Sequence, residues 1–322
     1  MKRSAVMQRL NQYIEDINRI EFTVTHSCTS KCRHCSVGNQ KGTSRLSPIK
    51  VQEVVQKITQ TNQVESVMTF GGEPLLVPEV TSAIHEEARR CGIPIRQIIT
   101  NGCFTNKEER IREVAHMLVL SGVNDILLSV DCFHQEFLSL AQVRKFVEAL
   151  QNEYTGRLRL HPSWVVNDSD DNQYNVRTRE CLSYFDDLHL EGSRGNIIFP
   201  AGNAVQNLAE YFIKQPLDSN FRCGQAPYTV ELDKVNEIVI DANGDVFTCS
   251  FPIGNIMERD ILEIIRDYDP YTNPFTKALM SGGIDQLIAE AKLHGIEIDV
   301  TKFYTPCEIC HTIAQNWVSV AQ

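Results

Sequence analysis

The sequence lacks long apolar segments and an N-terminal targeting signal. No stretch approaches the roughly 20 consecutive apolar residues that a membrane-spanning helix needs. Residues 1–20 are polar and contain no apolar core of the kind found in signal peptides. Internal repeats and low-complexity tracts are also missing. We therefore expect a cytoplasmic protein that makes no membrane contact.

Basic residues are fewer than acidic residues. The chain has 31 Lys and Arg against 41 Asp and Glu, which gives a formal net charge of −10. A general nucleic-acid-binding protein carries a basic footprint, so we expect no nucleic-acid partner. The hydrophobic share of 42% is ordinary for a globular protein, and 322 residues exceed one average domain.

The order of apolar runs predicts an α/β architecture up to about residue 200. Short apolar runs alternate with segments that have helical periodicity. The expected strands are 20–25, 64–70, 96–100, 125–130, 157–166 and 196–199. Such alternation implies a parallel sheet with right-handed crossovers. Six strands fit either a partial (β/α)6 barrel or a doubly wound sheet, and the pattern alone does not choose between them.

The C-terminal third has a different pattern. Residues 237–241 and 245–248 flank Ala-Asn-Gly, which predicts a β-hairpin. Two helix-like runs follow. We therefore expect an α/β domain over residues 1–210, with an N-terminal helix over about 1–18, and a small α+β domain over residues 211–322.

Eleven cysteines are present, an odd number in a chain without an export signal. Metal ligands or reactive thiols are therefore more plausible than disulfides. Cys28, Cys32 and Cys35 form a Cys-x3-Cys-x2-Cys loop directly after the first expected strand. Three thiolates on one loop favour zinc or an iron–sulfur cluster. Structural zinc would need a fourth ligand, which His26 or His34 can supply.

Small and polar residues stand at the ends of the next three expected strands. These are Gly-Gly-Glu-Pro over residues 71–74, Thr-Asn-Gly over 100–102 and Ser-Val-Asp over 129–131. Ligands of α/β proteins bind beyond the carboxyl ends of parallel strands. The sequence therefore predicts a ligand that is approached from several strand ends.

In these motifs and their order, residues 22–200 resemble the radical S-adenosylmethionine (SAM) superfamily. The resemblance implies a partial (β/α)6 barrel for the first domain. It also implies that Cys28, Cys32 and Cys35 hold a 4Fe–4S cluster whose open iron binds SAM. His34 stands where the family often has an aromatic residue, and an imidazole can still stack there. The positions expected to contact SAM are Gly71, Gly72, Glu73, Pro74, Asn101, Ser129, Asp131, Asn196 and Ile198.

The resemblance also implies the chemistry. The family cleaves SAM reductively to a 5′-deoxyadenosyl radical that abstracts a substrate hydrogen atom, and it needs a low-potential electron donor such as flavodoxin or ferredoxin. Cys103 and Cys132 follow strand-end motifs, so we expect their thiols at the mouth of the site, where a thiol can return a hydrogen atom. His134 is a candidate base. The acidic stretch 167–176 is either a substrate loop or a solvated connection.

A second group of cysteines lies near the C-terminus: Cys223, Cys249, Cys307 and Cys310. With the hairpin and helices between them, they resemble the twitch domain, a shortened SPASM domain. The resemblance implies an auxiliary 4Fe–4S cluster without an open iron, which would accept an electron. A structural zinc site of four cysteines stays open. The molybdenum-cofactor cyclase of the superfamily has a different three-cysteine spacing and does not fit.

Relatives with twitch or SPASM domains act on two substrate classes. One is ribosomal peptides, which are oxidised, cross-linked or epimerised. The other is small polyols or aminocyclitols, which are dehydrogenated. We favour an oxidoreductase that modifies a peptide, with polyol dehydrogenation as the alternative. A non-enzymatic zinc-binding protein is a further alternative, but it leaves the strand-end motifs without a purpose.

Overall fold

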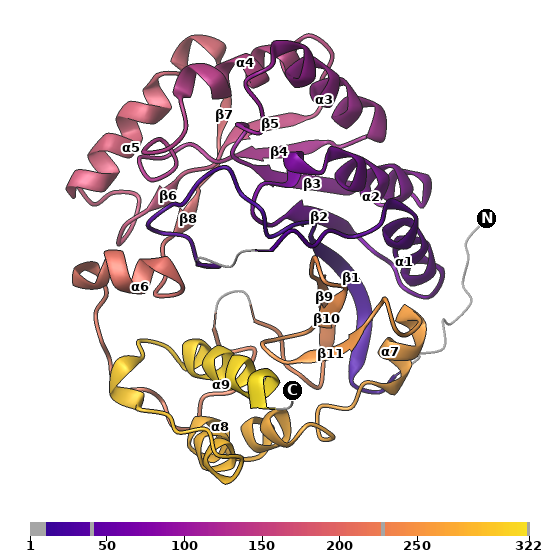
Figure 1. Ribbon diagram of the computed structural model, residues 1–322, viewed down its shortest axis with the longest axis vertical. Helices are drawn as coiled ribbons and strands as arrows, with labels where there is room; N and C mark the ends of the chain where they lie inside the picture. The colour runs from indigo at the N-terminus through magenta and orange to yellow at the C-terminus, as the bar shows by residue number, and fades with distance from the viewer. Residues whose placement is uncertain (1–10, 39–41, 227–228, 321–322) are drawn as a thin grey trace.

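A curved nine-stranded sheet forms the centre of the protein (Figure 1). The computed structural model describes residues 11–38, 42–226 and 229–320. In spatial order the strands are β11 (Pro252–Asn255), β10 (Asp245–Phe247), β9 (Val235–Ile240), β1 (Ile14–Thr23), β2 (Ser66–Phe70), β3 (Ile95–Thr100), β4 (Asp125–Leu128), β5 (Arg157–Leu160) and β7 (Glu191–Gly192). All neighbouring pairs from β9 to β7 are parallel, which confirms the α/β class.

Helices connect the parallel strands and cover one side of the sheet (Figure 1). They are α1 (Pro48–Thr61), α2 (Pro78–Arg90), α3 (Glu108–Ser121), α4 (Leu140–Gln151) and α5 (Gln173–Ser183). The C-terminal part adds α6 (Asn203–Asn207), α7 (Ile261–Asp267), α8 (Pro274–Leu293) and α9 (Pro306–Val320). Proline is the first residue of both α1 and α2, where its missing N–H costs no hydrogen bond. Gly122 ends α3 with a φ of 83°, a left-handed conformation that favours glycine.

The expected N-terminal helix is wrong for residues 14–18, which form the first half of β1; residues 1–10 lie outside the described residues. Ile14, Ile17 and Ile20 are buried at a spacing of three, which imitates a helix. The pairing of β1 with β9 shifts register between Ile14 and Arg19. Such an irregularity breaks the two-residue period of a strand, so the pattern misled the prediction.

The sixth strand of the sheet also differs from the prediction. The expected strand 157–166 is divided into β5 and β6 (Ser163–Trp164). β6 leaves the main sheet and pairs with β8 (Asn196–Ile197), which lies in the segment expected as the sixth strand. β7 takes that place beside β5 instead. A strand of two residues produces no periodic signal, so it could not be read from the sequence.

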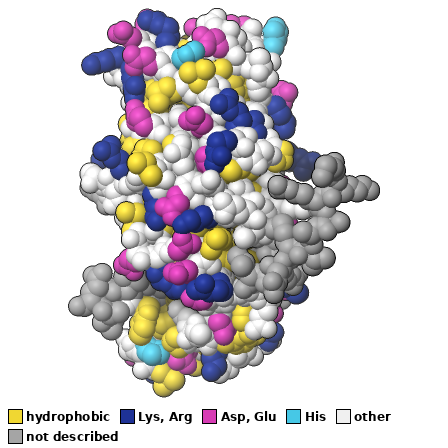
Figure 2. All heavy atoms as spheres, turned by 90° about the vertical axis from the view of Figure 1, so that its right-hand side faces the viewer, with side chains coloured by type: hydrophobic (Ala, Val, Ile, Leu, Met, Phe, Trp, Pro, Cys, Tyr) yellow, Lys and Arg dark blue, Asp and Glu magenta, His cyan; other side chains and the backbone are white. Residues whose placement is uncertain are grey.

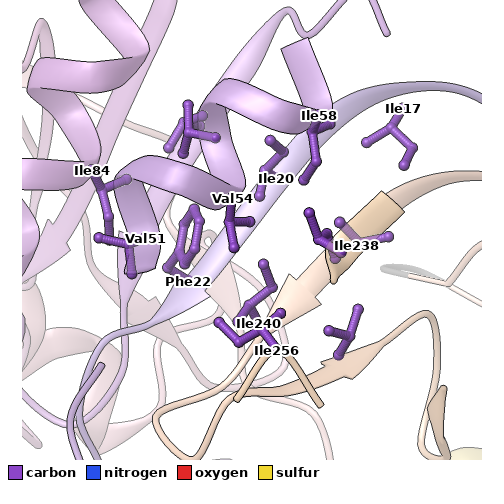
Figure 3. Close-up of a cluster of buried hydrophobic side chains, with 14 of the residues drawn as sticks. Ile17, Ile20, Phe22, Val51, Val54, Ile58, Ile84, Ile238, Ile240 and Ile256 are labelled. Atoms are coloured by element: carbon purple, nitrogen blue, oxygen red, sulfur yellow. The ribbon is translucent and has the colours of Figure 1, made fainter. Parts of the chain in front are cut away.

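The C-terminal hairpin is confirmed as β9 and β10, and it continues the main sheet. β9 pairs in parallel with β1, with Arg19 opposite Glu237 and Phe22 opposite Ile240. Figure 3 shows Ile238 and Ile240 facing the side chains of β1 and α1 within a single cluster of buried residues. The main sheet and this core cluster therefore contain residues from both sides of residue 210, where we expect the domain boundary.

Charged side chains of both signs alternate over the face seen in Figure 2, where neither sign gathers into a patch. Among the described residues, no helix is both long and apolar enough to cross a membrane.

We predict that Ile238→Ala destabilises the protein strongly. Ile238 is fully buried between β1 and α1, and removing a large core side chain costs about 2–5 kcal/mol. The loss would be measured as a lower melting temperature and a lower urea midpoint of the purified protein without bound iron. The matched control is Ile213→Ala, because Ile213 is 83% exposed and should tolerate the change. Equal losses in the two variants would contradict the shared core.

Candidate active site

A cavity of about 760 Å³ lies at the carboxyl ends of the parallel strands. Ten of the predicted site residues line it: Cys28, Cys32, Cys35, Gly71, Gly72, Asn101, Ser129, His134, Asn196 and Ile198. Five others do not: Glu73, Pro74, Asp131, Cys103 and Cys132. The structure thus brings the cysteine loop and three strand ends around one space.

The Gly-Gly pair after β2 holds the cysteine loop by direct backbone contact. Gly72 N–H donates to Thr25 O over 2.8 Å, and Glu73 N–H donates to Ser27 O over 2.8 Å. A Cβ on Gly72 would stand 2.1 Å from Ser27 O. Gly71 has a φ of 138°, and its Cβ would stand 2.5 Å from Thr25 O. Only glycine allows this approach, so these two residues fix the start of the cysteine loop.

The other end of the loop is held by residues that the sequence analysis missed. Asn203 N–H donates to Cys35 O over 2.9 Å, and its side-chain amide donates to Cys32 O over 3.1 Å. A Cβ on Gly202 would stand 2.4 Å from Ser36 O. A Gly-Asn pair is common in turns, and its partner lies some 170 residues away, so no local signal could have found this contact.

Glu73 connects two strand ends from beneath the cavity. Its carboxylate accepts hydrogen bonds from Leu75 N–H (2.9 Å), the Thr100 hydroxyl (2.6 Å) and Asn101 N–H (2.8 Å). The side chain is fully buried, and burial raises its pKa. Glu73 therefore orients Asn101, whose side-chain amide reaches Thr29 Oγ1 over 3.1 Å. In this structure its role is to position the neighbouring groups, and it does not line the cavity.

Asp131 has a similar role after β4. It is fully buried, and its carboxylate accepts from the N–H groups of Phe133 and His134 and from His134 Nδ1, each at about 3 Å. Burial acts to raise the pKa of Asp131, but His134 and His34 outweigh it and lower the pKa. Burial likewise acts to lower the pKa of His134, while Asp131 and Cys32 raise it well above its usual value. Asp131 thus anchors His134 against the cavity.

His34, at the position before the third cysteine of the loop, packs against two rings of the protein. Its ring centroid lies 4.9 Å from that of Phe133 and 5.0 Å from that of His134, which it meets edge-on. Burial lowers the pKa of His34 to about 4, so the imidazole is neutral at physiological pH.

Cys103 and Cys132 do not face the mouth of the site, so this expectation is wrong. Both are almost fully buried, at 3% and 1% exposure. Burial raises the pKa of Cys103 to about 12 and that of Cys132 to about 11. Cys103 N–H donates to Asn101 Oδ1, and this turn sends the thiol into the core between α3 and α4. Strand-end position alone did not decide which way either side chain points.

The stretch 167–176 is only partly a loop. Asn172 caps α5, because its side-chain oxygen accepts from the N–H groups of Tyr174 and Asn175. Asn175 is itself buried, and its amide donates to Val165 O over 3.0 Å. The Asn-rich composition therefore serves to fix the start of this helix.

The four C-terminal cysteines lie in one apolar cluster. Cys223 Sγ is 3.3 Å from Cys249 Sγ, and Cys249 follows the hairpin. Cys307 and Cys310 lie in the first turns of α9, close enough to Cys249 to interact electrostatically. Burial raises the pKa of both thiols of α9. Cys223 and Cys310 are buried, whereas Cys249 and Cys307 are half-buried. Thiolates gathered in one region are the ligands of zinc and iron–sulfur sites.

Residues 22–154 match the model of the Radical SAM superfamily. This match covers about two fifths of the chain and identifies a radical SAM domain, which indicates an enzyme and implies a 4Fe–4S cluster and SAM as cofactors. The family match excludes a non-enzymatic zinc-binding protein.

Two archaeal relatives are named probable GTP 3′,8-cyclases. The protein of Saccharolobus solfataricus is 21% identical over 292 residues, which cover 81% of this chain and 90% of the relative. That of Sulfurisphaera tokodaii is 27% identical over 190 residues, or 58% of each chain. The sequence analysis did not predict a cyclase and set aside the cyclase of the superfamily because of its cysteine spacing.

Three solved structures are similar at low identity. Streptococcus suis SuiB bound to SAM is 15% identical, with 90% of this chain and 75% of that chain covered and a TM-score of 0.41. BtrN with AdoMet and 2-DOIA is 18% identical, with 84% and 90% covered and a TM-score of 0.46. Native anSMEcpe with AdoMet and Kp18Cys peptide is 11% identical, with 94% and 97% covered and a TM-score of 0.49.

We predict that Gly72→Ala prevents cluster assembly, because the added Cβ collides with Ser27 O and displaces the cysteine loop. Iron content after anaerobic reconstitution would measure the loss. Gly192→Ala is the matched control, since a Cβ there meets nothing within 4 Å. A Gly72→Ala protein with the iron content of the wild type would show that the loop does not depend on this contact.

Proposed function

We propose that this radical SAM enzyme binds its 4Fe–4S cluster through Cys28, Cys32 and Cys35 and uses it to oxidise a substrate. One observation carries the proposal: the three thiols open onto the same cavity as Gly72, Asn101 and Ser129. The cavity volume lies within the range of small-molecule sites. When bound, the cluster supplies the electron that cleaves SAM into methionine and a 5′-deoxyadenosyl radical, which removes a hydrogen atom from the substrate.

The residues of this chain supply the binding and orientation that the cofactor needs. Gly71 and Gly72 leave room for the SAM methionine group, and Asn101 and Ser129 offer hydrogen bonds nearby. The segment from Asn196 to Phe199 lines the cavity, and Ile197 and Phe199 are half-exposed there. Apolar side chains at this wall fit the flat face of an adenine.

We also propose that the four C-terminal cysteines hold an auxiliary 4Fe–4S cluster in a twitch domain. Their place in one apolar cluster, with Cys223 Sγ 3.3 Å from Cys249 Sγ, supports a centre with four protein ligands, which would leave no iron open for substrate. Such a cluster would accept an electron and would favour net oxidation. A zinc ion at the same four thiols is the competing outcome.

The buried thiols argue against epimerisation. A peptide epimerase must return a hydrogen atom from a donor beside the substrate, but Cys103 and Cys132 do not line the cavity. The candidate base His134 does line it, although its Nδ1 is held by Asp131. Oxidation or cross-linking of the substrate therefore fits the site better.

The charge around the cavity supports an uncharged substrate group, and we propose a side chain of a ribosomal peptide. Lys31 is the single Lys or Arg among the described residues that line the cavity. Deeper in the barrel, Arg19 is bonded to Glu21 and Arg159 to Asp125. Among the described lining residues a triphosphate would meet a single Lys or Arg side chain, that of Lys31, which disfavours the GTP cyclisation named for the archaeal relatives. Dehydrogenation of a polyol or aminocyclitol stays the second candidate, since Ser, Thr and Asn side chains line the same walls.

We predict about eight irons per chain after anaerobic reconstitution, falling to about four when Cys28, Cys32 and Cys35 are all changed to Ala. The double variant Cys307→Ala/Cys310→Ala should also contain about four irons per chain. It should still cleave SAM in the presence of dithionite. About four irons in the wild type and none in the triple variant would show that the C-terminal cysteines hold zinc or no metal, and would contradict the auxiliary cluster.

We predict that Cys132→Ala and Cys103→Ala retain product formation, because neither thiol reaches the cavity. A peptide product that has lost two hydrogens, measured by mass spectrometry, is the expected readout. A product of unchanged mass and inverted configuration, lost in Cys132→Ala while SAM cleavage continues, would instead identify an epimerase.

We predict that peptides stimulate formation of 5′-deoxyadenosine more than polyols or GTP do. The reaction would be run with reduced flavodoxin and each of the three substrate classes in turn. Stimulation by GTP alone would contradict the proposed substrate class. It would indicate instead the GTP cyclisation for which the archaeal relatives are named.

A further inference from the structure

Three potential metal ligands meet at one wall of the cavity. Ligand atoms of Cys32, His34 and His134 all lie within 4.8 Å of one another. All three residues line the cavity, which gives an ion a route from solvent and room for a water ligand. Cys32 and His34 come from the cysteine loop, and His134 comes from the segment after β4. The tertiary structure therefore creates a ligand set that no local motif contains.

The Asp131 carboxylate orients one of these ligands. His134 Nδ1 lies 2.9 Å from Asp131 Oδ2, and an ionised carboxylate can only accept, so Nδ1 carries the proton. The remaining ring nitrogen, Nε2, is directed away from this bond. A metal-bound histidine usually donates its other N–H to a carboxylate in this way, and the metal replaces a proton on the ligating nitrogen.

His34 contributes a nitrogen that has no partner in the protein. Its Nδ1 is buried and makes no hydrogen bond. An unsatisfied buried polar atom costs free energy unless a ligand or water meets it. One thiolate and two imidazoles are ligands that zinc prefers, with the fourth position left for water.

We propose that Cys32, His34 and His134 bind a zinc ion in the protein before its cluster is inserted. Cys32 is also a ligand of the proposed 4Fe–4S cluster, so the two centres exclude each other. Bound zinc would thus occupy Cys32 and inhibit assembly of the 4Fe–4S cluster. This inference rests on the proposed function for its inhibitory effect, while zinc binding itself does not depend on that function.

The test compares zinc and iron in the full-length, cluster-free protein. Zinc bound per chain would be measured after incubation with Zn²⁺, and iron would be measured after anaerobic reconstitution with and without Zn²⁺. His34→Phe keeps the stacking on Phe133 but removes the nitrogen ligands. We expect this variant to bind about one zinc fewer than the wild type and to assemble its cluster in the presence of zinc.

His26→Phe is the matched control, because His26 lines the same cavity outside the group of three ligands. It should bind as much zinc as the wild type. All variants keep the C-terminal cysteines, so any zinc bound there is the same in each. It therefore does not affect the difference in zinc content between the wild type and a variant. If His34→Phe does not fold, His134→Asn removes a different ligand and should show the same loss.

Unchanged zinc binding and unchanged inhibition in both ligand variants would overturn the proposal. Failure of the wild type to take up iron in the absence of zinc would count against the proposed function alone. The difference in zinc between wild type and His34→Phe would still decide the zinc site.

Discussion

The backbone contact between residues 71–73 and residues 25–27 is the constraint on which the site depends. Two hydrogen bonds of 2.8 Å join these segments, and neither Gly71 nor Gly72 can carry a side chain there. The contact is possible because β1 and β2 are adjacent and parallel, so their carboxyl ends meet at the same edge. The position of the cysteine loop is thereby set by the sheet, and its far end is closed by Asn203.

Buried carboxylates extend this rigidity to the other strand ends. Glu73 ties the end of β2 to that of β3, and Asp131 ties the end of β4 to Ser163 and His134. Each carboxylate is fully buried and satisfied by several donors. Polar groups at a cofactor site need such support, because a satisfied network holds the contacting atoms in place. Residues behind the cavity are therefore as important to its geometry as those that line it.

The C-terminal part is joined to the barrel at the sheet. β9 extends the sheet beside β1, and Ile238 and Ile240 share the core beneath α1 (Figure 3). Asp241, at the end of β9, lies 3.7 Å from His26 in the cysteine loop.

The sequence by itself determined the alternation of strands and helices, the glycine caps and the position of the cysteine loop, because these depend on local periodicity and spacing. It also indicated ten of the residues that line the cavity, since strand ends of a parallel sheet meet at one edge. Only the tertiary structure decided where side chains point: Glu73, Asp131, Cys103 and Cys132 are turned away from the cavity by hydrogen bonds and core packing. The two-residue strand β7, the contact of Asn203 with the cysteine loop and the meeting of Cys32 with His134 join residues far apart in the chain, and the free energy that forms them comes from packing that local patterns do not encode.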